Sequence, residues 1–164
     1  LFALKGVLAV VAVVALVHDV LIILGVFSIL GKVIGLEVNA MFIVGILTVI
    51  GYSVNDTIVV FDRLRENLLI DSTRSFEVSV NASILESIGR SLNTSITTLV
   101  VGFALLLFGG TTIRELVIVL IVGIIAGTYS SIFVASHLLV AWERGELSRI
   151  FGRIPLLNRK TSTS

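Results

Sequence analysis

Long apolar stretches separated by short polar segments dominate the pattern of this chain. Four stretches, at about residues 6–30, 41–61, 91–108 and 115–142, each hold roughly the 20 residues that an α-helix needs to cross a hydrocarbon core. β-Branched residues are abundant, but the stretches are too long for barrel strands and do not alternate apolar with polar residues. The pattern predicts an all-α membrane protein built as a bundle of four transmembrane helices.

The connections between these stretches differ in character. Gly31 to Val38 and Gly109 to Thr112 form short turns, whereas residues 62–90 form a long, charged link. Within the link, apolar residues recur at every fourth position: Phe76, Val80, Ile84 and Ile88. This spacing predicts a helix with one apolar face, and two interpretations fit it equally: a helix lying along the membrane surface, and a solvated helical linker.

The composition supports a membrane environment. Of the 164 residues, 56% are hydrophobic and 14% are charged, whereas an ordinary soluble domain is about 25% charged. A soluble core of this size cannot bury so many apolar residues, so lipid must solvate them. Cysteine is absent, which excludes a disulfide framework, a cysteine-ligated zinc site and a thiol nucleophile in this sequence.

Lysine and arginine are distributed unevenly, which predicts the orientation. The two short turns hold only Lys32 and Arg114. The other ten of the 12 basic residues precede the first stretch, lie in the link or lie in the tail: Lys5, Arg63, Arg65, Arg74, Arg90, Arg144, Arg149, Arg153, Arg159 and Lys160. The positive-inside rule therefore places both termini and the link in the cytoplasm. Residues 146–164 are predicted to be a disordered cytoplasmic tail.

Asp56 is the most informative polar residue. It lies five positions after Gly51, the midpoint of the second stretch, and therefore at membrane depth. An ionised carboxylate there is costly unless it is paired or reaches water. It can serve as a proton-binding group, because burial disfavours its charged form and a nearby cation favours it. It can also be an aspartate that only forms hydrogen bonds between helices.

The third stretch offers partners for Asp56 at a matching depth. It begins at Arg90 and is polar through Thr98, with hydroxyls at Thr94 and Thr97. Such groups can bind a carboxylate or hold a chain of water molecules. Two interpretations of Arg90 stay open: an inward guanidinium that pairs with ionised Asp56, and one more cytoplasmic arginine at the membrane edge.

His18 and Asp19 lie near the middle of the first stretch. Adjacent helical residues diverge by about 100°, so both cannot face the same neighbour. We include Asp19 in a candidate proton relay, although a purely structural role explains the pair as well.

Small residues recur at spacing four in the fourth stretch. Gly123, Gly127 and Ser131 form a ladder that lets helix backbones approach closely. We therefore expect this face to pack against another helix. Thr128, Ser130 and Ser131, near the middle of the membrane, can also add to a polar path.

The stretch from Gly51 to Asn67, GYSVNDTIVVFDRLREN, resembles the signature of the SecF family of bacterial protein-export membrane subunits. Three further segments agree in order and spacing: His18-Asp19, residues 90–98 and residues 127–132. The resemblance covers about residues 1–150. It implies a domain of the resistance-nodulation-division type, in which the aspartate of the Asn55-Asp56 pair carries protons and Arg90 acts with it.

The resemblance also implies partners and a location. These are SecD, the SecYEG translocon, a translocating preprotein and the lipid bilayer of the bacterial cytoplasmic membrane, with protons as the coupling ion and with no cofactor, catalytic residue, metal or nucleic acid. Members of the family have six transmembrane helices and a periplasmic domain between the first two. This chain matches only the last four helices, so we expect it to be the C-terminal part of a longer protein.

Several other functions fit parts of this sequence. Another proton-coupled exporter of the same superfamily is the main alternative, and the continuation from Asp62 to Asn67 argues against it. An intramembrane aspartyl protease would use Asp19 and Asp56 as a dyad, but its Gly-x-Gly-Asp pattern is missing. A rhomboid-like serine protease lacks its motif as well. A structural subunit without proton chemistry also fits the pattern.

Overall fold

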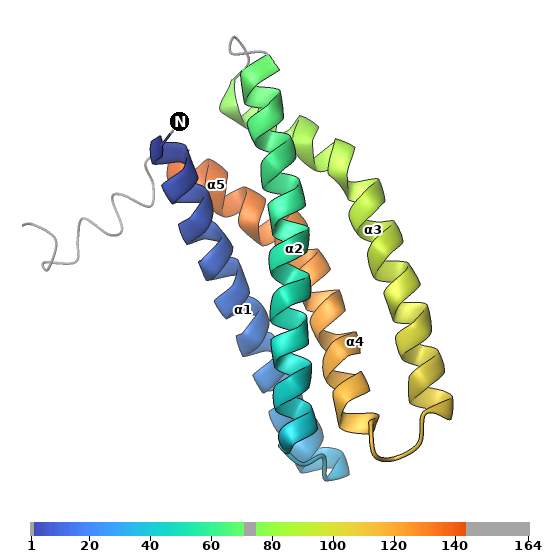
Figure 1. Cartoon of the computed structure of the whole chain (residues 1–164). Coiled ribbons are helices and arrows are strands. Elements are labelled where there is room, and N and C mark those ends of the chain that lie inside the picture. The colour runs from blue at the N-terminus through green and yellow to red at the C-terminus, as the bar shows by residue number, and fades with distance from the viewer. Residues whose placement is uncertain (1, 71–74, 144–164) are drawn as a thin grey trace, which may run out of the picture.

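The computed structural model describes residues 2–70 and 75–143 (Figure 1). Every described element is a helix: α1 (Phe2–Ile34), α2 (Ala40–Ile70), α3 (Phe76–Phe108), α4 (Arg114–Tyr129), the π-helical turn η1 (Ser130–Val134) and α5 (Ala135–Glu143). Within these residues, four helical segments are long and apolar enough to cross a membrane, with α4, η1 and α5 counting as one. The predicted all-α membrane class is confirmed. The predicted tail at residues 146–164 lies outside the described residues.

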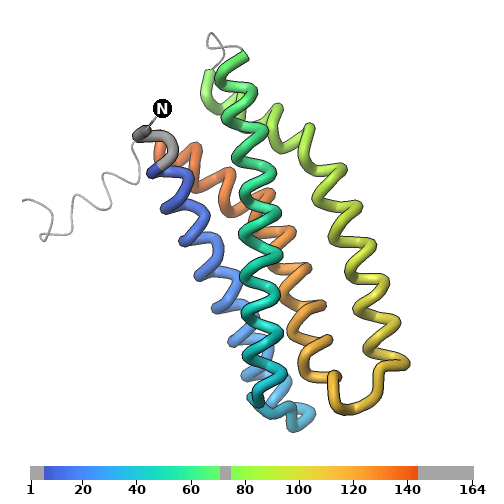
Figure 2. The backbone as a smooth tube through the Cα atoms, in the orientation of Figure 1, coloured from blue at the N-terminus to red at the C-terminus, as the bar shows by residue number. Residues whose placement is uncertain are grey.

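The four segments run alternately up and down the bundle (Figures 1 and 2). α2 occupies the centre and contacts α1, α3 and α4. The two short turns lie at one end, and the start of α1, the end of α2, the start of α3 and α5 lie at the other. The segments that the sequence assigns to one side of the membrane are therefore together at one end of the molecule, called the link end below.

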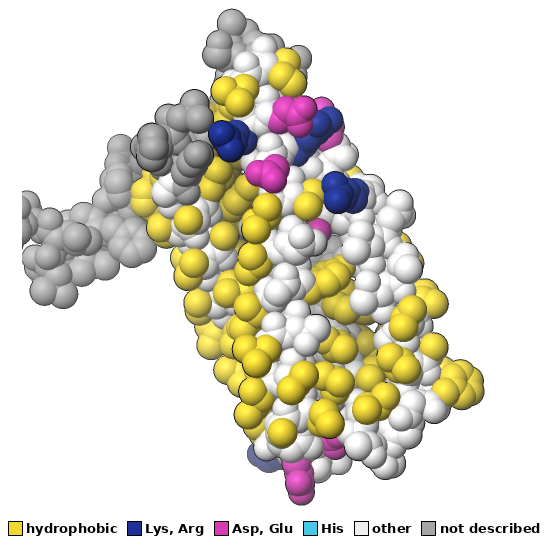
Figure 3. Space-filling model, viewed as in Figure 1, with side chains coloured by type: hydrophobic (Ala, Val, Ile, Leu, Met, Phe, Trp, Pro, Cys, Tyr) yellow, Lys and Arg dark blue, Asp and Glu magenta, His cyan; other side chains and the backbone are white. Residues whose placement is uncertain are grey.

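Side chains on the face seen in Figure 3 form bands. Apolar groups cover the middle of the bundle, and Lys, Arg, Asp and Glu gather near its two ends. Many of the most exposed apolar side chains lie on the outer faces of the helices, such as Leu47 of α2, which is 63% exposed. This distribution suits a bundle whose outer surface meets lipid.

α2 and α3 continue well past the apolar stretches that predicted them. Their 31 and 33 residues correspond to about 47–50 Å, against a hydrocarbon core of about 30 Å. Most of the predicted link at residues 62–90 is therefore not a separate segment but extends these two helices. Phe76, Val80 and Ile84 pack against an apolar cluster that includes Val60 and Leu64. The expected apolar face packs against other helices at these three positions, where Val80 is buried and Phe76 and Ile84 are half-buried. Ile88, its fourth expected member, is also half-buried.

α2 and α4 run parallel and pack through small residues. A β-carbon added to Gly123 would meet the side chain of Val49, and one added to Gly127 would lie 3.3 Å from Cβ of Ser53. Gly45 of α2 plays the reciprocal part, because a β-carbon there would lie 2.9 Å from the side chain of Val119. Close backbone approach at these glycines sets the distance between the two helices that carry the site described next.

Candidate functional site

Asp56 points from α2 into the bundle, where the residue is only 8% exposed. Ser91 Oγ of α3 donates a hydrogen bond to its Oδ1 at 2.6 Å, and Ser131 Oγ of η1 donates to its Oδ2. Both carboxylate oxygens therefore accept from hydroxyls on other helical segments. A carboxylate at membrane depth needs such partners, so Asp56 connects three segments of the bundle.

The π-helical turn η1 positions Ser131. Such turns insert one extra residue into a helix and often occur at functional sites. Here two consecutive serines are both buried: Ser130 Oγ lies 3.4 Å from the backbone oxygen of Ala15 in α1, and Ser131 reaches Asp56 in α2. Ser131 Oγ also lies 3.2 Å from the backbone oxygen of Thr128. Its single proton thus has two acceptors within reach.

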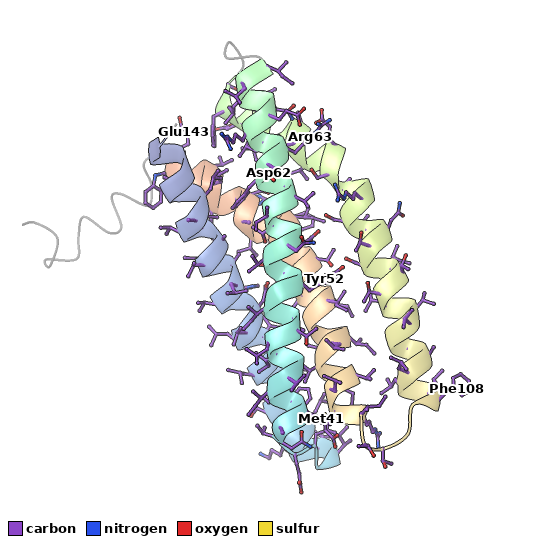
Figure 4. The ribbon with its side chains drawn as sticks, viewed as in Figure 1. Met41, Tyr52, Asp62, Arg63, Phe108 and Glu143 are labelled. Carbon is purple, nitrogen blue, oxygen red and sulfur yellow. The ribbon has the colours of Figure 1, made fainter. Side chains whose placement is uncertain are left out.

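A chain of hydroxyls continues from this site toward the far end of the bundle. Tyr52, which points from α2 toward α3 (Figure 4), shares a 2.9 Å hydrogen bond with Ser95 Oγ. Ser95 Oγ lies 2.5 Å from Thr128 Oγ1, which donates to the backbone oxygen of Ile124. A hydroxyl can both donate and accept, so a reversed donor at one hydroxyl can reverse the hydrogen bond that the next hydroxyl makes on a neighbouring helix.

A polar cavity of about 140 Å³ lies beside Asp56. Its lining comes from α2 and α3 and consists of Tyr52, Asn55, Asp56, Val59, Arg90, Ser91 and Thr94. Since one water molecule occupies about 30 Å³ in the liquid, this volume and polarity suit a small group of water molecules. Asn55, Arg90 and Thr94 thus line the same cavity as Asp56.

The structure does not pair Arg90 with Asp56. Arg90 is exposed and lines the same cavity, but no ion pair joins it to the carboxylate within residues 2–70 and 75–143. Hydroxyls satisfy both Asp56 oxygens instead. Both interpretations of Arg90 therefore remain compatible with its position.

The predicted threonines do not bind Asp56. Thr94, Thr97 and Thr98 are exposed, and each donates to the backbone carbonyl four residues earlier in α3. A threonine hydroxyl on a helix commonly bonds to its own helix in this way. Of the three, only Thr94 lines the cavity. The relay role of the three threonines stays a prediction.

Serines form the inner face of α3 instead. Buried serines recur at every fourth position: Ser79, Ser83, Ser87, Ser91 and Ser95. Two of them supply the hydroxyls that reach Asp56 and Tyr52. Ser91 and Ser95 lie in the polar segment expected to face Asp56, whereas Ser79, Ser83 and Ser87 were not expected to share its face. The strict spacing of four is visible in the sequence and marks a single helix face.

Asp19 is a second buried carboxylate, only 1% exposed. Ser53 Oγ of α2 donates to its Oδ2 at 2.5 Å, and His18 Nδ1 lies 3.2 Å from its Oδ1. His18 is half-exposed whereas Asp19 is buried, so the two side chains have different surroundings although they contact each other. Asp19 and Asp56 bind different hydroxyls, and no hydrogen bond joins them in the described part of the chain. A proton-sharing protease dyad is therefore not formed.

The sequence matches the family model described as "Protein export membrane protein SecD/SecF, C-terminal" over residues 2–145. The chain belongs to this family. Among curated members of the SecD/SecF family, it is 55% identical over 142 residues to "Protein translocase subunit SecF" of Thermobaculum terrenum, covering 87% of this chain and 45% of that protein. It is 56% identical over 135 residues to the subunit of the same name in Desulfurispirillum indicum, covering 80% and 42%.

The fold agrees with a solved structure in the SecD/SecF family. The crystal structure of SecDF from Thermus thermophilus, titled as a translocon-associated membrane protein, aligns with a TM-score of 0.78 and 43% identity. The alignment covers 84% of this chain and 19% of SecDF. The chain thus spans about half the length of the curated relatives that it matches.

Proposed function

We propose that this chain forms the proton-coupling transmembrane part of a Sec protein translocase subunit. In this role it assists protein export with SecD and the SecYEG channel and does not act as an enzyme. The observation that carries the proposal is Asp56, a buried carboxylate held by hydroxyls of two other helical segments beside a polar cavity. The names of the curated relatives support the translocase assignment.

Protonation of Asp56 changes the direction of a hydrogen bond. When ionised, the carboxylate accepts from both Ser91 and Ser131. When protonated, it must donate one bond, so one hydroxyl must turn its own proton elsewhere. Ser131 has an alternative acceptor in the backbone oxygen of Thr128, 3.2 Å away. One proton therefore alters the contact between α2 and η1, where the helix is already irregular.

The coupling follows from this two-state contact. A proton that enters from one side of the membrane and leaves to the other biases the packing of α2 against η1 twice in each cycle. Arg90 lines the cavity and stabilises ionised Asp56 by its charge. Asp19 of α1 is a second proton-binding group, and its donor Ser53 lies on α2 three residues before Asp56. The partners of this movement are SecD, SecYEG and the translocating preprotein.

The proposed location is the bacterial cytoplasmic membrane, with both termini and the link end on the cytoplasmic side. Ten of the 12 Lys and Arg residues belong to that side in the sequence. The asymmetry matches the positive-inside rule.

The central test is Asp56→Asn in a complete SecF that carries this sequence, reconstituted with SecD and SecYEG. Asparagine keeps the size and accepts hydrogen bonds but cannot ionise. We expect assembly to persist, while the stimulation of preprotein export by the proton-motive force is lost. The measurement is export into sealed vesicles with and without the proton gradient.

Glu37→Gln is the matched control, because Glu37 is an exposed carboxylate in the short α1–α2 turn. This variant should keep full stimulation. Full stimulation in Asp56→Asn would refute the role of Asp56 and leave a helical scaffold without proton chemistry.

A further inference from the structure

A hollow of about 490 Å³ lies between the start of α3 and α5, near the link end of the bundle. Part of its lining is apolar and includes Val80 of α3 and Val140 of α5. Both helices also contribute polar side chains to it: Glu77 and Asn81 from α3, and Ser136 and His137 from α5. This α3–α5 hollow therefore offers an apolar surface and hydrogen-bonding groups to one ligand.

Ser136 is the buried polar residue of this lining. It is 3% exposed, and its Oγ has no hydrogen-bond partner among the described residues. A buried hydroxyl without a partner costs about 1–3 kcal/mol. A ligand that brings an acceptor into the hollow would satisfy Ser136.

His137 and Asn81 add two exposed groups to the hollow. His137 Nδ1 lies 2.7 Å from the backbone oxygen of Phe133, an acceptor, so Nδ1 carries a proton and Nε2 is left for another partner. The amide of Asn81 can donate two hydrogen bonds and accept others. Together with Ser136, these residues offer donors to a ligand that carries several acceptor oxygens.

The charge of the lining selects among such ligands. Among the described residues that line the hollow, Glu77 is a carboxylate and none is Lys or Arg. An anionic headgroup would meet this negative charge with no strong cation to offset it. A headgroup with both a phosphate and a primary ammonium is complementary, because the ammonium can donate to Glu77. Glu77 has another contact in the structure, but a carboxylate accepts from more than one donor.

Trp142 indicates that the hollow lies at the level of the lipid headgroups. It directly follows the lining residues of α5 and is 41% exposed, as expected of a tryptophan at a membrane interface. α5 ends one residue later at Glu143, at the link end (Figure 4). The polar groups of the hollow are therefore close to the boundary between lipid and water.

An apolar surface continues from the hollow toward the middle of the bundle. His137 also lines a second hollow, of about 280 Å³, together with Tyr129, Phe133 and Val134. Tyr129 and Phe133 are exposed, and their rings stack with centroids 5.2 Å apart. From Ala141 to Tyr129 is a rise of about 18 Å along the helix, close to the roughly 15 Å of one leaflet of a 30 Å hydrocarbon core.

We propose that the α3–α5 hollow binds one phosphatidylethanolamine molecule from the leaflet on the link side. Its ammonium binds Glu77, its phosphate accepts hydrogen bonds from Ser136 and Asn81, and one acyl chain lies along Phe133 and Tyr129. The bound lipid thereby joins the start of α3 to α5. This site does not depend on proton binding by Asp56.

Lipid titration followed by native mass spectrometry tests the site. A complete SecF that carries this sequence is purified in detergent without phospholipid, and phosphatidylethanolamine or phosphatidylglycerol is added. We expect phosphatidylethanolamine to bind at least about tenfold more tightly, a difference of about 1.4 kcal/mol. Equal dissociation constants for the two lipids would overturn the proposal.

Two variants assign the lipid groups to residues. Glu77→Gln keeps the size but not the charge, so it should abolish the preference for phosphatidylethanolamine. Ser136→Ala should weaken both lipids, since both carry the phosphate, although without lipid it removes only an unpartnered hydroxyl. Glu37→Gln is the matched control, because Glu37 is an exposed carboxylate in the α1–α2 turn at the opposite end, and it should keep the preference.

Two further outcomes would contradict the site. An unchanged preference in Glu77→Gln would show that the ammonium does not bind there. Binding of phosphatidylethanolamine that appears only after residues 144–164 are removed would show that this segment, not lipid, occupies the hollow.

Discussion

Hydroxyls, not a cation, satisfy the buried carboxylate at the centre of this bundle. Ser91 and Ser131 donate to Asp56, whereas three nearby threonines donate to their own helix backbone. The difference follows from the helix face on which each hydroxyl lies. A hydroxyl on the outer face has only its own carbonyl ladder as an acceptor in lipid, whereas one on the inner face meets a stronger acceptor in the carboxylate.

Ser131→Ala should destabilise the protein in a pH-dependent way. Its hydrogen bond is to an ionised carboxylate at high pH, where such a bond contributes about 1.5–3 kcal/mol, and to a neutral acid at low pH, where it contributes about 0.5–1.5 kcal/mol. The loss of stability should therefore be larger at high pH than at low pH. Denaturant unfolding of the complete protein in detergent at two pH values measures this.

Ser136→Ala is the control, because Ser136 is buried in α5 and its Oγ has no hydrogen-bond partner in the described structure. Its effect should be small and independent of pH. A loss in Ser131→Ala that is the same at both pH values would show that Ser131 does not sense the charge of Asp56.

At the level of elements, the distance between α2 and α4 determines whether the side chains on these two helices can reach each other at the site. The two parallel helices fit through Gly45, Gly123 and Gly127, each opposite a residue with a β-carbon. Without a hydrophobic driving force between helices in lipid, such close packing is a main source of association. Ser53, which donates to Asp19, lies in this contact between α2 and α4. The hydrogen bond between Ser131 and Asp56 lies next to it along the same two segments.

Gly123→Ala should destabilise the bundle by about 1–3 kcal/mol, because the added methyl group would collide with the β-branched side chain of Val49. Gly127→Ala should cost less, since its β-carbon would lie 3.3 Å from Ser53. Gly51→Ala is the control, with no atom within 4 Å of the new group. Thermal unfolding of the complete protein in detergent gives the ranking.

A double variant makes this prediction sharper. In the double variant Gly123→Ala/Val49→Ala, the valine side chain that the added methyl group would strike is shortened. The double variant should therefore be more stable than the sum of the two single losses predicts. Additive losses in the double variant would contradict the proposed contact.

For the whole molecule, the positions of the helix ends make the two ends of the bundle different. The start of α1, the end of α2, the start of α3 and α5 share one end, and a hollow lined by Asp62, Arg63, Glu66, Glu86 and Arg90 lies near that end (Figure 1). The positive-inside rule applied to the sequence predicts that this is the cytoplasmic end.

Single-cysteine labelling tests this orientation in a complete protein from which other cysteines are removed. Thr111→Cys, in the exposed α3–α4 turn, should react only with reagent on the periplasmic side. Ser75→Cys, at the start of α3 and also exposed, should react only from the cytoplasm. Reaction of Thr111→Cys from the cytoplasm alone would reverse the topology.

The sequence by itself determined the class of the fold and the residue at its centre. Four long apolar stretches require helices in lipid, because lipid offers no partner to an unpaired backbone. An aspartate at membrane depth is conspicuous in the sequence, because placing its charge inside the bilayer costs free energy. The glycine ladder of α4 and the apolar face at Phe76, Val80 and Ile84 were likewise visible as periodic spacing, since periodicity depends only on helix geometry.

Only the tertiary structure decided which groups meet. The sequence places Thr94 and Ser95 at the same depth, but the rotation of α3 about its axis turns the serine inward and the threonine outward. The π-helical turn at Ser130–Val134 has no pattern of its own in the sequence, yet it directs Ser131 to Asp56. Likewise, packing against neighbours covered the apolar face at residues 76–84, which spacing alone could not assign to lipid, water or protein. Helix rotation and neighbour choice are set by contacts between distant segments, and local periodicity carries no information about them.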